Sequence, residues 1–237
     1  METKQGRVDS SGRAFAGSQL QMQIYANQKS DELTRAIIVE LGLDPLVARI
    51  EWRSPLEKTK YAEPKDAAFL EAAGIADAAA SLAEFWPLSG PRWDGLGLLH
   101  TGTEQPTILL VEAKSYPKEI FGSGCTASHP DSVSLIDRSL DRAKEYFGIS
   151  PETDWKGGLY QYANRLAHLH FLREKLGRNA VLINLCFTGD RDPRTTTRAD
   201  WDAALQDVKS ELGFTGGAVP HTVDVFLPCL SRDVLTA

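Results

Sequence analysis

The sequence contains little cysteine and no long apolar segment. Its three cysteines are widely spaced and form no Cys-x-x-Cys pair, which excludes a disulfide scaffold, a zinc finger and a thioredoxin-like redox site. They are Cys125, Cys186 and Cys229. No apolar run approaches the roughly 20 residues that span a bilayer, and the polar N-terminus lacks the apolar core of a signal peptide. These absences predict a cytoplasmic protein with reduced thiols and no membrane partner.

Positive charge is not in excess either. The chain has 26 Lys and Arg against 32 Asp and Glu, a formal net charge of −6. Non-specific affinity for nucleic acid comes from Lys and Arg that displace phosphate counterions, so a surface coated with basic residues is excluded. A local basic cleft is not excluded. Arg138, Arg142 and Lys144 lie on a predicted helix, where a solvated face paired with neighbouring acids is the favoured interpretation.

Several common catalytic motifs are absent. Residues 95–100 begin like a dinucleotide fingerprint but lack its third glycine and lie within a predicted strand. His168 and His170 diverge on a helix and cannot chelate one metal in the i, i+4 manner. There is no Gly-x-Ser-x-Gly elbow and no phosphate-binding P-loop. A thiol nucleophile at Cys125 with His129 is a remote alternative, because an incidental loop thiol explains the same residues.

What is present is enough apolar material for one core. At 237 residues and 42% hydrophobic content, a single domain over residues 19–237 is expected after a flexible polar tail at residues 1–18. Hydrophobic periodicity and turn residues predict both helices and strands. The helices are expected at 30–41, 66–85 (a pair interrupted at Gly74), 135–147, 155–176 and 197–212, and the strands at 48–52, 93–100, 107–111, 180–187 and 222–227.

One predicted hairpin concentrates charged residues. The buried-type run at 107–111 ends in Glu112, Ala113 and Lys114, and alternation along a strand puts Glu112 and Lys114 on the same face. The preceding strand joins it through a short turn-rich link. If Asp94 pairs with Glu112, the same register pairs residue 100 with residue 106. Two carboxylates and an ammonium group would then meet at one end of the hairpin.

Asp94 followed by Glu112-Ala113-Lys114 resembles the PD-(D/E)xK superfamily of restriction-endonuclease-like nucleases, over roughly residues 31–188. The resemblance implies an α/β restriction-endonuclease-like core with a mixed central sheet flanked by helices. Residues 54–90 would be a helical insertion before the active-site hairpin. The chain departs from the family pattern at the first proline, because Trp93 precedes Asp94. The segment Tyr-Gln-Tyr-Ala-Asn-Arg-Leu at 160–166 also resembles a helix of an uncharacterised bacterial family with no assigned activity.

The resemblance implies a nuclease that depends on Mg²⁺ or Mn²⁺ and hydrolyses phosphodiester bonds, with Asp94, Glu112 and Lys114 as catalytic residues. Mg²⁺ takes oxygen ligands, and Asp94, Glu112 and the carbonyl of Ala113 would supply them. The metal lowers the pKa of a bound water, and Lys114 would orient that water or stabilise charge on the phosphate. The expected partner is nucleic acid, DNA before RNA, while a homodimer or a partner protein stays open.

Four points stay open from the sequence. A third acid is either Glu40 or Glu84. Gln161, Arg165 and His168 share one helix face, which either faces the metal or the DNA backbone or is an ordinary polar face. Residues 117–134, rich in Gly and Ser, form either a lid or a plain connection. Finally, the Glu–Lys pair could be an exposed contact worth less than about 1 kcal/mol, in which case the protein is a non-catalytic module that binds protein or nucleic acid.

Overall fold

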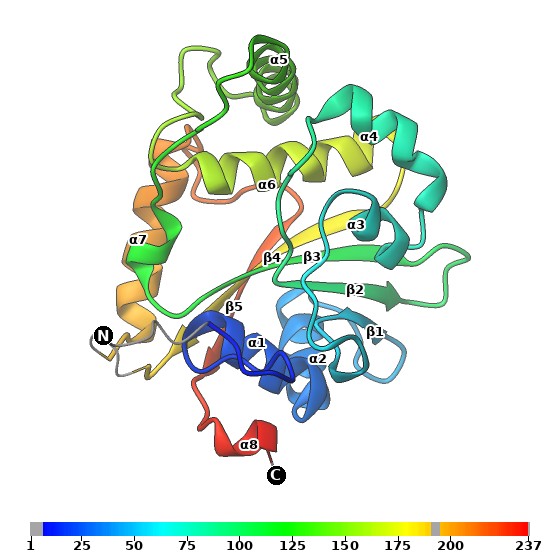
Figure 1. Ribbon diagram of the computed structural model, residues 1–237. Coiled ribbons are helices and arrows are strands. Elements are labelled where there is room, and N and C mark those ends of the chain that lie inside the picture. Colours follow the sequence, from blue (N-terminus) through cyan, green and yellow to red (C-terminus); the bar gives the residue numbers. More distant parts are fainter. Residues whose placement is uncertain (1–6, 191–194, 237) are drawn as a thin grey trace.

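The computed structural model describes residues 7–190 and 195–236 and shows an α/β protein built on one open, mixed sheet (Figure 1). The strand order is β1-β2-β3-β4-β5. Strand β2 runs antiparallel to its neighbours β1 and β3, whereas β3, β4 and β5 are parallel. The predicted mixed central sheet is therefore confirmed. The strands are β1 (Arg49–Ser54), β2 (Gly95–His100), β3 (Thr107–Lys114), β4 (Ala180–Thr188) and β5 (Thr222–Pro228).

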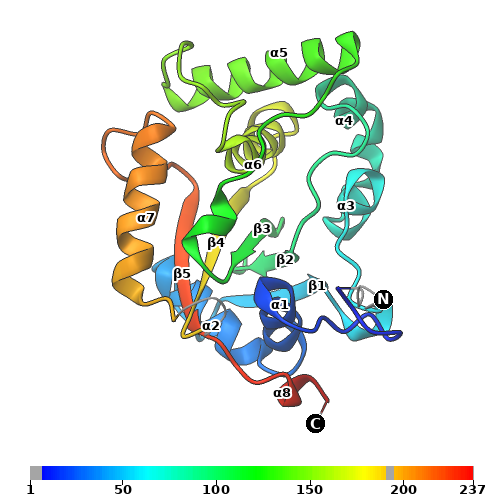
Figure 2. The same cartoon turned by 60° about the vertical axis from the view of Figure 1, so that its left-hand side comes forward.

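Helices cover both faces of the sheet. The longer ones are α1 (Gly17–Asn27), α2 (Ser30–Glu40), α5 (Pro130–Phe147), α6 (Tyr160–His170, continued by one π-helical turn, Phe171–Lys175) and α7 (Arg198–Glu211). The shorter ones are α3 (Asp66–Ala72), α4 (Ala79–Phe85), α8 (Asp233–Thr236) and the 3-10 turns η1 (Glu57–Thr59), η2 (Ala76–Ala78) and η3 (Pro117–Ile120). Figure 2 shows α1 and α2 on one side of the sheet, α6 on the other, and α5 as an outer layer over α6. No helix in the described ranges has the length and apolar character needed to cross a bilayer.

The hairpin of β2 and β3 has the predicted register. Gly95 pairs with Val111 and Leu99 with Thr107, which is the register that places residue 94 opposite residue 112. Strand β2 itself begins one residue after Asp94. In this register Leu96 pairs with Leu110 and Leu98 with Ile108, and all four side chains pack in one hydrophobic cluster.

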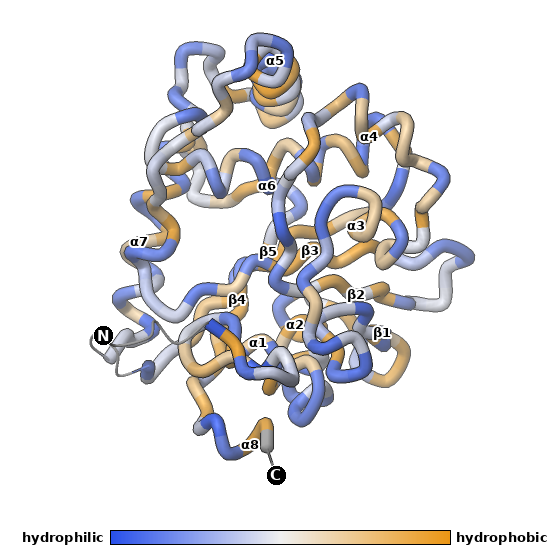
Figure 3. The backbone as a smooth tube through the Cα atoms, viewed as in Figure 1, coloured by the Kyte–Doolittle hydropathy of each residue, from blue (hydrophilic) through white to orange (hydrophobic). Residues whose placement is uncertain are grey.

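The central strands are buried on both faces, and apolar colouring gathers on β3 and β4 in Figure 3. Leu110 packs in the cluster that includes α5 and α6, while Leu109 and Val111 pack in the cluster formed with α1 and α2. Parallel strands between two helical layers have this two-sided burial. Because Glu112 and Lys114 alternate with Val111 and Ala113, they lie beneath α6 rather than at the surface.

The described part of the N-terminal segment is packed, not a free tail. Val8 forms a bridge with Ala14, which is fully buried, and the Ala14 N–H donates to Gln23 Oε1 at 2.8 Å. Helix α1 already begins at Gly17. The prediction of a flexible tail through Ser18 is therefore wrong for residues 7–18, and residues 1–6 lie outside the described ranges. The polar composition did not indicate this packing, because the segment is held by a hydrogen bond from its backbone to a side-chain amide of α1.

Helix α6 begins five residues later than its apolar pattern suggested. Asp154 Oδ1 accepts hydrogen bonds from the backbone of Lys156 and Gly157, a turn that Asp favours over helix. Trp155, expected in the helix, is instead buried in this turn and donates its indole N–H to the carbonyl of Leu212. The turn sets the position at which α6 crosses the sheet above Glu112.

Candidate active site

The structure brings Asp94, Glu112 and Lys114 together at the end of the hairpin. The backbone N–H of Ala113 donates to Asp94 Oδ2 at 2.8 Å, and Lys114 Nζ donates to Glu112 Oε1 at 2.5 Å. The Ala113 side chain points to the opposite face, where it is fully buried, so only its main chain lies beside Asp94. The convergence follows from strand alternation and from the hairpin register.

Helix α6 adds two more groups to this cluster. Gln161 Nε2 donates to Glu112 Oε1 at 2.8 Å, and Arg165 Nε donates to Glu112 Oε2 at 2.7 Å. Together with Lys114, these residues use both carboxylate oxygens of Glu112. The polar face of α6 is thus not a solvated face, since Gln161 and Arg165 both point at the hairpin.

Arg165 is itself held on several sides. Its Nη1 donates to Asn164 Oδ1 at 2.7 Å and its Nη2 to the carbonyl of Arg92 at 2.9 Å. Its guanidinium lies 4.9 Å from the ring centroid of Trp93, which is fully buried. Such a cation–π contact adds roughly 0.5–2 kcal/mol. Trp93, the residue that departs from the family pattern, therefore supports the cation that binds Glu112.

The two carboxylates differ in their electrostatic surroundings. Burial, reinforced by the nearby charge of Glu112, raises the pKa of Asp94 to about 8. Burial also opposes ionisation of Glu112, but Arg165 and Lys114 outweigh it and lower the pKa of that carboxyl. For Lys114, burial opposes the charged form, yet Glu112 and Asp94 outweigh it and raise its pKa. Asp94 is thus the acid whose charge is least compensated.

A third acid lies near the pair, and it is Glu63, in the loop between η1 and α3. Burial raises the pKa of Glu63, and the charge of Glu112 adds to the shift. The charge of Glu63 in turn helps to raise the pKa of Asp94. Glu63 Oε1 accepts a hydrogen bond from Gln19 Nε2 of α1 at 2.9 Å. The Pro-rich, charged stretch around it has no periodicity, so no local signal marked this residue.

Glu40 and Glu84, the two candidates from the sequence, do not serve as the third acid beside Asp94 and Glu112. Glu84 is exposed and pairs with Lys175 at 3.2 Å. Glu40 is exposed and lines a surface groove between α2 and β5. Both alternatives for the third acid are therefore corrected, because sequence order does not reveal which loop folds back over the hairpin.

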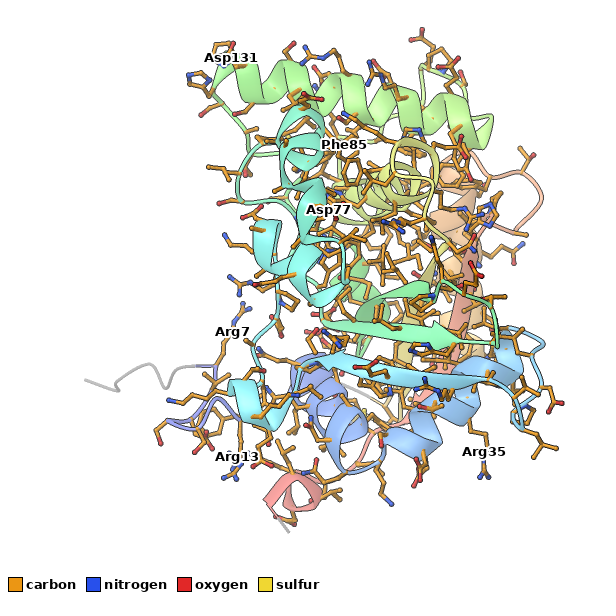
Figure 4. The ribbon with its side chains drawn as sticks, turned by 90° about the vertical axis from the view of Figure 1, so that its right-hand side faces the viewer. Arg7, Arg13, Arg35, Asp77, Phe85 and Asp131 are labelled. Carbon is orange, nitrogen blue, oxygen red and sulfur yellow. The ribbon has the colours of Figure 1, made fainter. Side chains whose placement is uncertain are left out.

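His168 belongs to the core. It is 2% exposed, and its ring packs against several aromatic side chains. These are Phe69, Phe85, Trp86 and Trp93, three of them from the segment before the hairpin. Its Nδ1 lies 2.8 Å from the carbonyl of Asn164, and burial lowers its pKa to about 3. Of the three residues on this helix face, His168 is the one that contacts neither carboxylate. Figure 4 shows Phe85 within this side-chain layer below α5.

The donor groups suit a cation that prefers oxygen. Mg²⁺ binds proteins through one or two carboxylates and completes its shell with water and substrate phosphate. Asp94, with its poorly compensated charge, and Glu112 can provide the carboxylates, with the main chain of Ala113 beside them. Within residues 7–190 and 195–236, no group of three or more His, Cys, Asp and Glu side chains is arranged to hold a metal. A small pocket of about 20 Å³ borders Glu112, Lys114 and Gln161, and this is room for about one water.

The segment that follows Lys114 is pinned to the start of α6. Gly122 N–H donates to the carbonyl of Gly158 at 2.8 Å, and Cys125 N–H donates to that of Lys156 at 2.9 Å. Helix α5 begins at Pro130, which shortens the expected loop. A lid closing over a phosphate could not use the amide of Gly122, because that amide already donates to Gly158. These contacts favour the plain connection over the lid.

Comparisons with protein-family models, with curated proteins and with solved structures find no match to this chain. A function for the site therefore depends on the contacts of Asp94, Glu112, Lys114 and the α6 residues that bind them.

Proposed function

We propose that this protein is a Mg²⁺- or Mn²⁺-dependent nuclease with a restriction-endonuclease-like core of the PD-(D/E)xK type. The observation that carries the proposal is the meeting of Asp94, Glu112 and Lys114 on one face at the end of a β-hairpin. The order of elements supports it, since the hairpin is followed by helices and then by strand β4, parallel to β3. The substrate class is nucleic acid, with DNA as the first candidate.

Each residue has a separate part in this proposal. Asp94, Glu112 and the Ala113 carbonyl would hold the ion, which when bound lowers the pKa of a water and neutralises phosphate charge. Lys114 has a raised pKa and keeps its proton at neutral pH, so it supplies positive charge to a phosphate oxygen rather than acting as a base. Gln161 and Arg165 fix the orientation of the Glu112 carboxylate.

A second function, a non-catalytic binding module, is favoured by one observation. Both oxygens of Glu112 already accept hydrogen bonds, from Lys114 and Gln161 at Oε1 and from Arg165 at Oε2. A metal ion at Glu112 must displace or share one of these donors. If Lys114 holds Glu112 permanently, the cluster is a structural ion-pair network and the protein binds nucleic acid or protein without cutting it.

Metal binding and cleavage separate the two functions. Mn²⁺ is titrated calorimetrically into the wild type and into Asp94→Ala. In a second experiment, single- and double-stranded DNA and RNA are incubated with the wild type or with Glu112→Gln in the presence of Mg²⁺ or Mn²⁺. We expect Mn²⁺ binding that Asp94→Ala abolishes, and cleavage that Glu112→Gln slows by about 100-fold or more. Glu84→Gln, an exposed carboxylate, is the matched control. Equal Mn²⁺ binding by the wild type and Asp94→Ala, or undiminished cleavage by Glu112→Gln, would reject the nuclease.

A further inference from the structure

A row of polar side chains crosses the sheet on the face beneath α6. Glu112 of β3 is in register with Asn184 of β4, and Asn184 with Asp224 of β5. Asn184 Nδ2 donates to the hydroxyl of Tyr162 at 2.8 Å and to Asp224 Oδ1 at 2.7 Å. Lys209 of α7 donates to Asp224 Oδ2 at 2.5 Å. The row thus connects the candidate active site to the far edge of the sheet.

Packing alone does not account for this row. Asn184 is 5% exposed and Lys209 is 9% exposed, while Leu182 and Leu185 beside Asn184 on β4 are fully buried. Taking polar and charged groups out of water has a cost that their mutual hydrogen bonds only partly offset, and apolar residues of similar volume are often at least as stable. A polar row in an apolar sheet is better explained by ligand binding at its outer end, where the Asp224 side chain is 21% exposed.

A groove lies at the outer end of the row. It has a volume of about 470 Å³ and is lined by Leu205, Gln206, Lys209, Thr215, Gly216 and Asp224, among others; we call it the distal groove. Leu205, which is buried, also lines the small pocket beside Glu112 and Asn184, so its side chain borders both hollows. Figure 2 shows α7 running along β5 at this edge, away from β1. The groove therefore opens at the edge strand β5, two strands from Glu112 of the candidate active site.

We infer that the distal groove binds the nucleoside of the nucleotide next to the scissile phosphate; this rests on the proposed function. Base edges carry closely spaced donors and acceptors, which amide and carboxylate side chains match. Gln206 provides a donor and an acceptor and Thr215 adds a hydroxyl, beside Asp224, whose oxygens accept from Asn184 and Lys209. The groove does not suit a phosphate, because the charge of Lys209 is already paired with Asp224. Its volume lies in the range of small-molecule pockets.

Uncharged nucleosides test the groove directly. The full-length protein, in EDTA, is titrated with each of the four deoxynucleosides, and backbone amide shifts are followed by NMR. We expect shifts at Gln206 and Thr215 with at least one nucleoside. The double variant Gln206→Ala/Thr215→Ala should weaken binding about tenfold, because two hydrogen bonds are lost. Gln206 and Thr215 are both exposed, so the double variant should keep its fold. Gln28→Ala, an exposed glutamine at the end of α1, is the matched control and should bind like the wild type.

Absence of groove shifts at millimolar nucleoside, or shifts that the double variant leaves unchanged, would overturn the inference. The outcome is separable from nuclease activity, because EDTA removes divalent ions and nucleosides contain no bond to cleave. Cleavage of nucleic acid without nucleoside binding rejects the groove alone. Nucleoside binding that requires Gln206 and Thr215, in a protein that neither binds Mn²⁺ nor cleaves, keeps the nucleoside site and rejects the nuclease.

Discussion

Arg165 Nε lies 2.7 Å from Glu112 Oε2, and both side chains are more than nine-tenths buried. This ion pair joins α6 to β3 and sets the direction in which the Glu112 carboxylate points. A buried charge without its partner is far more costly than an exposed one, because water cannot replace the lost contact. The pair is therefore both a stability element and the positioning device of the candidate site.

The first prediction concerns that pair. Arg165→Met should lower the free energy of unfolding by about 3–5 kcal/mol, since it leaves Glu112 buried with Lys114 as its remaining cation. Arg53→Met, which removes the exposed pair with Glu51, should cost less than about 1 kcal/mol. Urea denaturation measures both. Adding Glu112→Leu to Arg165→Met should recover most of the loss, and similar losses in the two single variants would contradict the assignment.

The second prediction concerns pH. Burial raises the pKa of Asp94 from its ordinary value of 3.8 to about 8, so the folded state holds this proton more tightly than the unfolded state. Asp94 therefore makes the metal-free protein less stable as pH rises from about 4 to about 8. Asp94→Asn should remove this loss of stability. At pH 8 the free energy of unfolding of this variant should exceed that of the wild type by about 1–3 kcal/mol. The gap should narrow toward acid pH.

Denaturation in EDTA at intervals across this range provides the measurement, with the exposed Asp207→Asn as control. Glu112 acts in the opposite direction, because its lowered pKa contributes stability that is present above its unfolded pKa and is lost in acid. A variant Asp94→Asn that is less stable than the wild type at pH 8 would show that the Asp94 charge is compensated.

The third prediction concerns the third acid. Glu63→Gln should weaken Mn²⁺ binding about three- to tenfold, because a nearby, partly buried negative charge attracts the cation. Glu40→Gln and Glu84→Gln should leave the affinity unchanged, since both residues are exposed and lie elsewhere. Calorimetric titration of the three variants decides the matter. An effect of Glu84→Gln as large as that of Glu63→Gln would restore the assignment considered from the sequence.

The fourth prediction concerns the segment after Lys114. Gly124 has a φ of +80°, and a Cβ there would lie 2.8 Å from the carbonyl oxygen of Lys156. Gly124→Ala should therefore break the contact between Cys125 N–H and Lys156, and lower amide protection at residue 125 about tenfold. Gly122→Ala has open space for its Cβ and is the matched control. Hydrogen exchange measures both, and equal protection in the two variants would mean that the segment is not pinned.

Local patterns along the chain were sufficient for several elements. The hairpin register followed from the sequence once Asp94 was paired with Glu112 across a short link, and the strands have this register. Thr197 and Asp200 predicted the start of α7, where both halves of a capping box are present. These features depend on residues within one hairpin or one helical turn, and so the sequence carries them directly.

The contacts of the site were decided by tertiary structure. Asp94, Glu112 and Lys114 could be placed on one face from the sequence alone, since a short link joins their strands. The bonds from Arg165 and Gln161, the approach of Glu63, and the alignment of Glu112 with Asn184 and Asp224 could not. Parallel register is not set by a tight turn but by how whole helices pack between distant strands. By itself the sequence determined which residues could do chemistry, and the long-range packing of α6, α7 and the Glu63 loop decided which of them meet.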